Sequence, residues 1–301
     1  MQTLVTGGAG FIGSHLLDAL LARGDEVTTV DDLSSGRRER VPDGVTLRVV
    51  DIADPAAIAP VFADAQPEVV FHLAAQVDVR ASVADPYRDA RLNVAGTASV
   101  LEAARRAGAR RLLLASTGGA LYGETDLLPT PESAPLEPFS PYGASKAAAE
   151  TYCALYTRLH GLSTLALRFG NVYGPRQDPH GEAGVIAIFA GAASERRPVT
   201  VFGDGEQTRD YVYVGDVVAG FLAAADADAT GAVNIGTGIE TSVLELVRAL
   251  GVEPRYEPSR TGEVARSCLD VTRAFDSLGW QAEVALAEGL ERTLAAVRAA
   301  T

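Results

Sequence analysis

Two patterns of apolar positions alternate along the first two-thirds of the chain, short β-branched runs and longer segments with helical periodicity. In the two longest segments apolar residues recur at three- and four-residue spacing, which predicts amphipathic helices. The predicted strands cover residues 2–6, 26–31, 46–51, 69–73, 111–116 and 164–168, and the predicted helices cover residues 11–23, 55–63, 86–107 and 141–160. This alternation is typical of a doubly wound parallel sheet with helices on both faces.

The pattern loosens after about residue 171 into Gly- and Pro-rich loops, short helices and isolated strands. Residues 210–225 and 233–238 indicate a return to the main sheet. We therefore expect an α/β chain of two interleaved domains. The larger covers residues 1–170 and about 210–238, and the smaller, mainly C-terminal one covers about 171–209 and 239–301, with helices at 271–278 and 286–299.

The composition narrows the possible partners. A formal charge of −13 at pH 7 argues against a nucleic-acid partner, because such a surface needs a basic face. No apolar stretch approaches the roughly 20 residues that span a bilayer, and no leader-like segment precedes the first strand. The two cysteines, Cys153 and Cys268, share no metal-ligand spacing. We expect a cytoplasmic enzyme with no metal and no membrane contact.

Three glycines, Gly7, Gly10 and Gly13, follow the first predicted strand and open the first predicted helix. Glycine here permits a tight turn, lets the backbone approach a pyrophosphate, and leaves the helix N-terminus aimed at it. Similar turns occur in α/β proteins that bind no dinucleotide, so the motif depends on its context. Its place between a strand and a helix favours a Rossmann-type dinucleotide site.

Asp31 ends the second predicted strand, where an acidic side chain meets the adenosine ribose of a dinucleotide. A carboxylate accepts a hydrogen bond from the 2′-hydroxyl and repels a 2′-phosphate, which favours NAD over NADP. Arg37 and Arg38 could engage a 2′-phosphate if Asp31 turned away. Asp51 and Ile52, after the third strand, are expected to flank the adenine.

Tyr142 and Lys146 lie four residues apart near the start of a predicted helix, on one face. Lys146 is the one lysine among 26 basic residues, and arginine cannot easily replace a compact ammonium that serves chemistry. A neighbouring ammonium favours the phenolate of a tyrosine whose pKa is ordinarily about 10. The pair therefore predicts a general base for oxidation of a substrate hydroxyl, although the spacing alone also fits an ordinary amphipathic helix.

Together these features resemble an extended short-chain dehydrogenase/reductase and, within that group, the nucleotide-sugar epimerases of the UDP-glucose 4-epimerase type. The resemblance covers nearly the whole chain. It rests on residues 6–13, Asp31, 51–52, 72–76, Asn93, 121–123, Tyr142 with Lys146, 167–176, 201–207, 209–212 and 260–263. It implies tightly bound NAD, a UDP-sugar substrate inverted at C4 through a transient 4-keto sugar, and a homodimer formed through helices 86–107 and 141–160.

The resemblance also implies which residues contact each ligand. The expected NAD contacts are Gly7, Gly10, Phe11, Ile12, Gly13, Asp31, Asp32, Ser35, Gly36, Asp51, Ile52, Leu73, Ala74, Ala75, Gln76, Asn93, Ser116, Tyr142, Lys146, Phe169 and Val172. The expected substrate contacts are Thr117, Gly118, Tyr142, Asn171, Val185, Val201, Phe202, Gln207, Arg209, Arg260, Glu263 and Ser267. Arginines are expected on the diphosphate because their planar fork suits phosphate oxygens. The small Ser267 stands at the family's size gate and predicts that N-acetylated UDP-hexoses are also accepted.

One position departs from the family pattern. The resemblance places a serine or threonine that hydrogen-bonds the reacting hydroxyl at Gly118. The hydroxyl has either moved to Thr117 or been dispensed with, and we favour Thr117 as the third catalytic residue. A 4,6-dehydratase would carry Thr-Asp-Glu in this segment, and neither Gly118 nor Gly119 is a carboxylate.

Two other functions stay open. Another NAD-dependent nucleotide-sugar dehydratase or reductase on this fold would share Tyr142 and Lys146 but lose water or release NADH. A non-catalytic dinucleotide-binding regulator would keep the fold without turnover. Consumption of added NAD would indicate the first, and stoichiometric NAD binding without conversion of any sugar would indicate the second.

Overall fold

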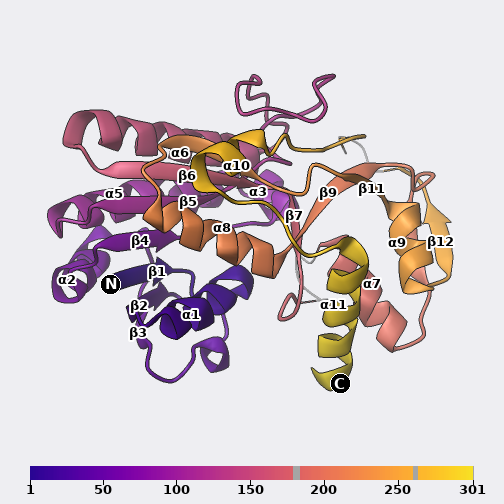
Figure 1. Ribbon diagram of the computed structural model, residues 1–301, viewed down its shortest axis with the longest axis horizontal. Helices are drawn as coiled ribbons and strands as arrows, with labels where there is room; N and C mark the ends of the chain where they lie inside the picture. The colour runs from indigo at the N-terminus through magenta and orange to yellow at the C-terminus, as the bar shows by residue number, and fades with distance from the viewer. Residues whose placement is uncertain (179–183, 260–263, 301) are drawn as a thin grey trace.

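The computed structural model describes residues 1–178, 184–259 and 264–300, and its centre is a seven-stranded parallel sheet (Figure 1). The strand order is β10-β6-β5-β4-β1-β2-β3. The strands are β1 (Gln2–Thr6), β2 (Glu26–Asp31), β3 (Thr46–Val49), β4 (Val69–His72), β5 (Arg111–Thr117), β6 (Ser163–Phe169) and β10 (Gly231–Ile235). The order reverses between β1 and β4, as in a Rossmann fold, which confirms the predicted fold class.

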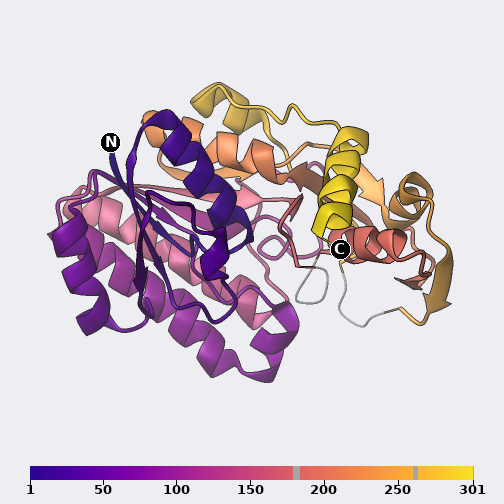
Figure 2. The same ribbon diagram turned by 90° about the horizontal axis from the view of Figure 1, so that it is seen from below.

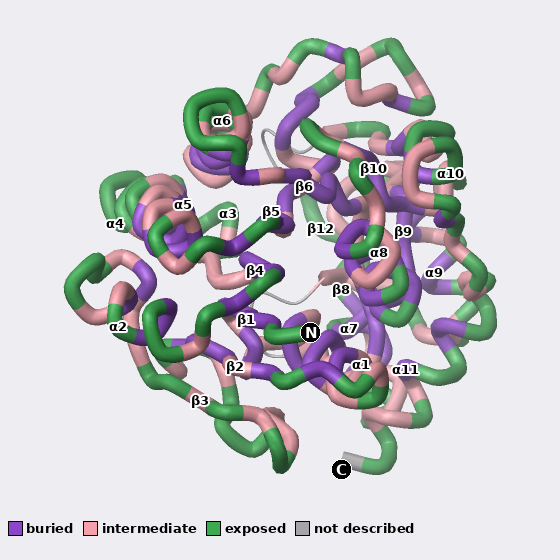
Figure 3. Tube along the Cα trace, turned by 60° about the vertical axis from the view of Figure 1, so that its left-hand side comes forward, coloured by how far each residue is buried: buried purple, intermediate pink, exposed green. Residues whose placement is uncertain are grey.

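Helices cover both faces of this sheet because successive strand residues point to opposite sides. Val5 packs into the core beneath α1 (Phe11–Arg23) and α8 (Val214–Asp226), whereas its neighbour Leu4 packs into the core on the other face. The second core is covered by α2 (Pro55–Ala65), α5 (Gly96–Arg106) and α6 (Pro141–His160). Figure 3 shows these two sets of helices on opposite sides of the sheet.

The remaining elements gather beyond the carboxyl ends of the strands, to the right in Figures 1 and 2. They include a three-stranded sheet, a two-stranded sheet and three helices that share a separate core, in which Phe189, Val201 and Leu246 are buried. These elements are β7 (Asn171–Tyr173), β9 (Thr208–Tyr213) and β11 (Glu240–Ser242), β8 (Val199–Phe202) and β12 (Pro254–Glu257), and α7 (Val185–Ser194), α9 (Val243–Leu250) and α11 (Leu286–Ala300). Helix α10 (Thr272–Leu278) returns to the main sheet and packs against β10.

Two predictions from the sequence need correction. Residues 210–225 do not all return to the main sheet, because β9 pairs with β7 and β11 and only α8 covers the main sheet. The buried Tyr211 and Tyr213 of β9 pack into the separate core, which explains this pairing. The helix predicted at 86–107 is interrupted, and the structure divides it into α4 (Pro86–Ala90), a π-helical turn (Arg91–Ala95) and α5.

Two smaller differences concern the main sheet and its connections. The structure adds the short helix α3 (Val79–Ala84), which the sequence pattern did not predict, and ends β3 at Val49 rather than at residue 51.

Over the described residues, no helix is both long and apolar enough to cross a membrane.

Candidate active site

The glycine loop lies at the point where the strand order reverses, the usual ligand position in an open α/β sheet. Gly7 has a φ of +77°, and a Cβ there would lie 2.7 Å from the backbone nitrogen of Ala74. A Cβ on Gly13 would lie 2.1 Å from the carbonyl oxygen of Gly7. Gly10 is the N-cap of α1 and has no side chain to occupy the first N–H groups of the helix. Side chains at Gly7 and Gly13 would therefore disrupt this tight turn. The turn leaves the N-terminus of α1 open, which suits a pyrophosphate.

Asp31 lies at the carboxyl end of β2, against the same loop. Its Oδ2 accepts a hydrogen bond from the Ala9 N–H (2.9 Å) and its Oδ1 accepts one from the Leu33 N–H (2.9 Å). Burial raises the pKa of Asp31, and these hydrogen bonds oppose the rise. Arg37, the possible partner of a 2′-phosphate, forms an ion pair with Asp178 (3.1 Å). Asp31 has not turned away from the loop, so the arrangement fits NAD.

Four further predicted NAD residues, Asp51, Ile52, Gln76 and Asn93, lie near the carboxyl ends of β3 and β4. Ile52 is buried beneath Gly96, where an added Cβ would lie 2.8 Å from Ile52 Cδ1. Asp51 forms an ion pair with Arg91 (3.1 Å). Asn93, in the π-helical turn, holds the backbone of Gln76: its Oδ1 accepts from the Gln76 N–H and its Nδ2 donates to the Gln76 carbonyl, both at 2.9 Å. This pairing fixes the segment 73–76 beside the glycine loop.

Three further predicted NAD residues, Gly36, Asp32 and Phe169, have different surroundings. Gly36 must be glycine, because a Cβ there would lie 2.6 Å from Asp31 Oδ1. The Asp32 carboxylate accepts from the Ser34 hydroxyl (2.6 Å). Phe169 points into the main core, edge-on to Phe221 with ring centroids 5.5 Å apart. Its side chain is therefore part of the core, and only its backbone remains for a cofactor contact.

The predicted catalytic pair lies near the start of α6. Ser140 caps the helix by accepting the Gly143 N–H on its Oγ (3.1 Å), so Tyr142 lies in the first turn and Lys146 in the next. Lys146 Nζ lies 6.0 Å from the centre of the Tyr142 ring and donates to the carbonyl of Ala115 (3.0 Å). Burial lowers the pKa of Lys146 to about 8, although nearby carboxylates oppose the fall. The structure thus brings the two predicted residues together, with Lys146 buried and Tyr142 partly exposed.

Thr117 is the hydroxyl that accompanies this pair. Burial and the charge of Asp89 raise the pKa of Tyr142, whereas a hydrogen bond with the Thr117 side chain lowers it. Ser116, the preceding residue on β5, instead donates to Glu150 Oε1 (2.6 Å). A side chain at Gly118 would require Leu269 to move, because a Cβ there would lie 2.5 Å from Leu269 Cδ2. The packing of Leu269 gives a physical reason for the departure seen in the sequence.

A cavity of about 580 Å³ lies on the substrate side and contains five of the predicted substrate residues, with additional lining residues that the sequence did not indicate. The predicted ones are Asn171, Val185, Phe202, Gln207 and Arg209, and the additional ones include Phe189, Arg197, Thr200 and Tyr211. Val201 is fully buried in the separate core and is not among the residues that line the cavity. Arg260 and Glu263 lie outside the described residues.

Ser267 does not line this cavity but lies near Gly119, two residues after Thr117. A Cβ on Gly119 would lie 3.6 Å from Asn171 Oδ1 and 3.9 Å from Ser267 Oγ. Ser267, the predicted size gate, therefore lies beside the segment that carries Thr117, and the cavity residue Asn171 lies next to it. None of Gly119, Asn171 and Ser267 carries a large side chain, so they leave space at this point.

Several buried residues that hold the site were not recognised from the sequence. Asp210 accepts from the Thr237 N–H (2.7 Å), the Gly238 N–H (3.1 Å) and the Leu269 N–H (3.3 Å), so it joins β9 to the segment that carries Ser267. His72 lies between the hydroxyls of Thr6 (2.7 Å) and Thr97 (3.0 Å), and burial lowers its pKa to about 3. Polar residues within apolar runs were the only available signal, and such residues can equally be structural.

Comparison with known proteins agrees with this geometry. A model of the NAD dependent epimerase/dehydratase family matches residues 3–236. The chain belongs to this family. The UDP-glucose 4-epimerase of Mycolicibacterium smegmatis is 49% identical over 306 residues, covering 98% of this chain and 97% of that protein. The predicted membership of the extended short-chain dehydrogenases/reductases is confirmed.

Two solved structures of family members superpose on the whole chain. One is the UDP-glucose 4-epimerase of Thermotoga maritima with UDP-glucose, 45% identical, with a TM-score of 0.97 and coverage of 100% of this chain and 99% of that one. The other is the UDP-glucose 4-epimerase of Thermus thermophilus in complex with NAD, 44% identical, with a TM-score of 0.94 and full coverage of both chains. The glycine loop, Asp31 and the Tyr142–Lys146 pair fit the NAD that this family uses.

The contact between Gly118 and Leu269 yields a direct prediction. Gly118→Ala should destabilise the protein by about 1–3 kcal/mol through overpacking. Leu269→Ala should cost about 2–5 kcal/mol by itself, because it leaves a cavity. The double variant should be more stable than the sum of the two losses implies, by about 0.5–3 kcal/mol. Urea unfolding of the four proteins, followed by circular dichroism, measures this coupling, and strictly additive losses would contradict the packing argument.

Proposed function

We propose that the chain interconverts UDP-glucose and UDP-galactose by inverting C4 with tightly bound NAD. The observation that carries the proposal is the cluster of Tyr142, Lys146 and Thr117. It lies at the same edge of the sheet as the glycine loop, and Gly119, two residues after Thr117, lies beside Asn171 of the cavity. Epimerases at 44–49% identity over the whole chain support it. These relatives do not favour the first alternative, another NAD-dependent dehydratase or reductase. They do not favour the second, a non-catalytic regulator, either.

Each catalytic side chain has a separate part in the oxidation. Bound NAD supplies the acceptor and donor of the hydride at C4 of the sugar. Tyr142 takes the proton of the 4-hydroxyl, and the ammonium of Lys146 stabilises the phenolate. Thr117 hydrogen-bonds the tyrosine and orients the reacting hydroxyl. The pKa of Lys146, about 8, means that the ammonium is present below pH 8 and is lost as the pH rises above it.

Inversion then requires the keto sugar to present its other face. Arg209 lines the cavity and is suited to hold the diphosphate while the sugar rotates about its link to it. Tyr142 returns the proton as C4 is reduced from the opposite side. We assign residues 1–170 and about 214–238 to the part that holds NAD. Residues about 171–213 and 239–301 hold the UDP-sugar, since β9 pairs with β7 and β11 and not with the main sheet.

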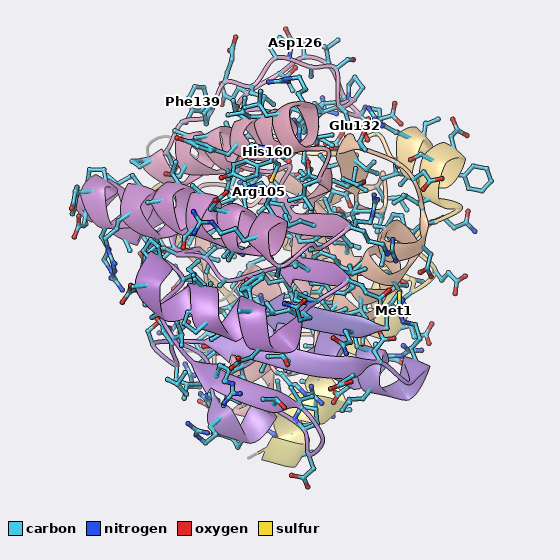
Figure 4. The ribbon with its side chains drawn as sticks, turned by 90° about the vertical axis from the view of Figure 1, so that its left-hand side faces the viewer. Met1, Arg105, Asp126, Glu132, Phe139 and His160 are labelled. Carbon is cyan, nitrogen blue, oxygen red and sulfur yellow. The ribbon has the colours of Figure 1, made fainter. Side chains whose placement is uncertain are left out.

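We also propose that two copies of the chain form a homodimer through α5 and α6, on one face of the main sheet. Helices α5 and α6 pack side by side, and their ends are marked by Arg105 and His160 in Figure 4. Large apolar side chains remain exposed on and near these helices, among them Tyr87 (79% exposed) and Leu159 (66% exposed). Such exposure on neighbouring helices suits a protein interface. A cytoplasmic location likewise stays a prediction.

The proposed function is tested with the purified protein and no added NAD. We expect UDP-glucose and UDP-galactose to interconvert when followed by NMR, because NAD is retained and regenerated in every turnover. A panel of UDP-, dTDP- and GDP-sugars measures selectivity in the same assay. Net formation of NADH, loss of water from the sugar, or NAD binding without conversion of any sugar would each contradict the proposal.

Substitutions separate the roles of the catalytic residues. Lys146→Met should abolish turnover, because the phenolate loses its buried positive neighbour. Thr117→Ala should slow turnover by about 10- to 100-fold, the loss expected for a hydrogen bond to a charged group. Thr117→Ser keeps the hydroxyl and is the matched control, with a rate near that of the natural chain. A Thr117→Ala variant with unchanged turnover would remove Thr117 from the mechanism.

The size of the sugar site depends on Ser267. We expect the natural chain to epimerise N-acetylated UDP-hexoses as well as UDP-glucose, since Ser267 and Gly119 leave space beside Asn171. Ser267→Tyr should suppress turnover of the N-acetylated sugars and spare UDP-glucose, whereas Ser267→Ala should leave both unchanged. The measurement is kcat/KM for each sugar. Rejection of both N-acetyl sugars by the natural chain would contradict this prediction.

A further inference from the structure

Asp89 is a fully buried carboxylate that no step of the proposed reaction uses. It lies on α4, one residue before the helix ends and the π-helical turn begins, and its exposure is 0%. Its Oδ1 accepts hydrogen bonds from Gln76 Nε2 (2.9 Å) and Asn93 Nδ2 (3.0 Å). Its Oδ2 is buried and has no hydrogen-bond partner in the part of the chain that the structure describes. A buried acceptor in this condition destabilises a fold unless a charge compensates it.

Helix α4 packs directly against α6, the helix that carries Tyr142 and Lys146. Among the described residues no cation lies within 4 Å of the Asp89 carboxylate, so its charge acts across this helix contact and not through a direct ion pair. The negative charge of Asp89 raises the pKa values of both Lys146 and Tyr142. Gln76 and Asn93 carry no charge, and Lys146 is the buried cation on the facing helix.

The other titratable groups that face Lys146 leave this role to Asp89. On α6, Glu150 is already paired with the guanidinium of Arg168 (2.6 Å). Cys153, also on α6, is a neutral thiol, because burial raises its pKa to about 12. On β4, His72 is a neutral imidazole, because burial lowers its pKa to about 3.

The local backbone is arranged to keep Asp89 in place. The π-helical turn Arg91–Ala95 follows α4 at once, and Asn93 within it donates to Asp89 and to the Gln76 carbonyl through the same amide group. Gln76 in turn donates to Asp89. The carboxylate is thus tied to the segment at the end of β4, on a helix that packs against α6. Interruptions of this type often occur at functional sites.

We propose that Asp89 is a positioning residue of the proposed epimerase, whose buried carboxylate stabilises the positive charge of Lys146 across the contact between α4 and α6. It acts on the reaction through Lys146. By keeping the ammonium charged, it extends the pH range in which Tyr142 has a cation beside it. This inference rests on the proposed function for its catalytic meaning, but the electrostatic part can be measured without any turnover.

The single lysine makes this measurement direct. Protein labelled with 13C at lysine Cε has one lysine side-chain resonance, that of Lys146, and its chemical shift follows the charge of the ammonium. In the natural chain we expect a titration near pH 8. In Asp89→Asn, which keeps the shape of the side chain and removes its charge, the midpoint should fall by about one pH unit. The matched control is Asp85→Asn, which removes an equal charge from the exposed N-cap of the same helix and should leave the midpoint unchanged.

Activity gives the second readout. The alkaline loss of kcat should move to lower pH by about the same one unit in Asp89→Asn, with KM for UDP-glucose within about twofold of the natural value. If asparagine prevents folding, the smaller Asp89→Ser repeats both measurements. An unchanged Lys146 midpoint in a folded Asp89 variant overturns the inference. A shifted midpoint in a protein that converts no sugar would overturn only the proposed function.

Discussion

A buried ammonium is the constraint on which the rest of the site depends. Lys146 is almost fully enclosed, and removing its charge from water is costly unless oxygen atoms and negative charge surround it. The carbonyl of Ala115 meets the ammonium directly, and carboxylates on two helices provide the negative potential. The polar residues around Lys146 therefore offset the cost of burying its charge beside Tyr142.

The parallel sheet meets this constraint by bringing distant segments to one edge. The glycine loop after β1, the Gln76 segment after β4 and Thr117 at the end of β5 all lie at carboxyl ends of adjacent strands. Asp210 then joins β9 to the segment that carries Leu269, so the packing that excludes a side chain at Gly118 is itself anchored by a buried carboxylate. The glycine loop, α6 and the substrate cavity are thus held by a small number of buried or partly buried hydrogen bonds.

The elements that could be predicted from the sequence are those that depend on apolar periodicity and capping residues within one short segment. Strands such as β1 and β2 and helices α1 and α6 match the periodicity and the capping residues that the chain displays. The interruption at Arg91–Ala95 could not be predicted, because it depends on Asn93 reaching the backbone of Gln76, a contact between segments far apart in the sequence. The pairing of β9 and the role of Leu269 at Gly118 are likewise contacts between distant segments. Tyr142 and Lys146 could be proposed from the sequence because their spacing places them on one helix face, after a glycine loop, and because Lys146 is the one lysine of the chain.

The central claim is that one carbon of the sugar is oxidised and then reduced within a single site by the same retained cofactor. UDP-glucose labelled with deuterium at C4, mixed with the purified protein in ordinary water, tests it most directly. The account predicts that the UDP-galactose formed keeps deuterium at C4, because the abstracted hydride returns to the carbon from which it came. Loss of the label to solvent during interconversion would contradict the account.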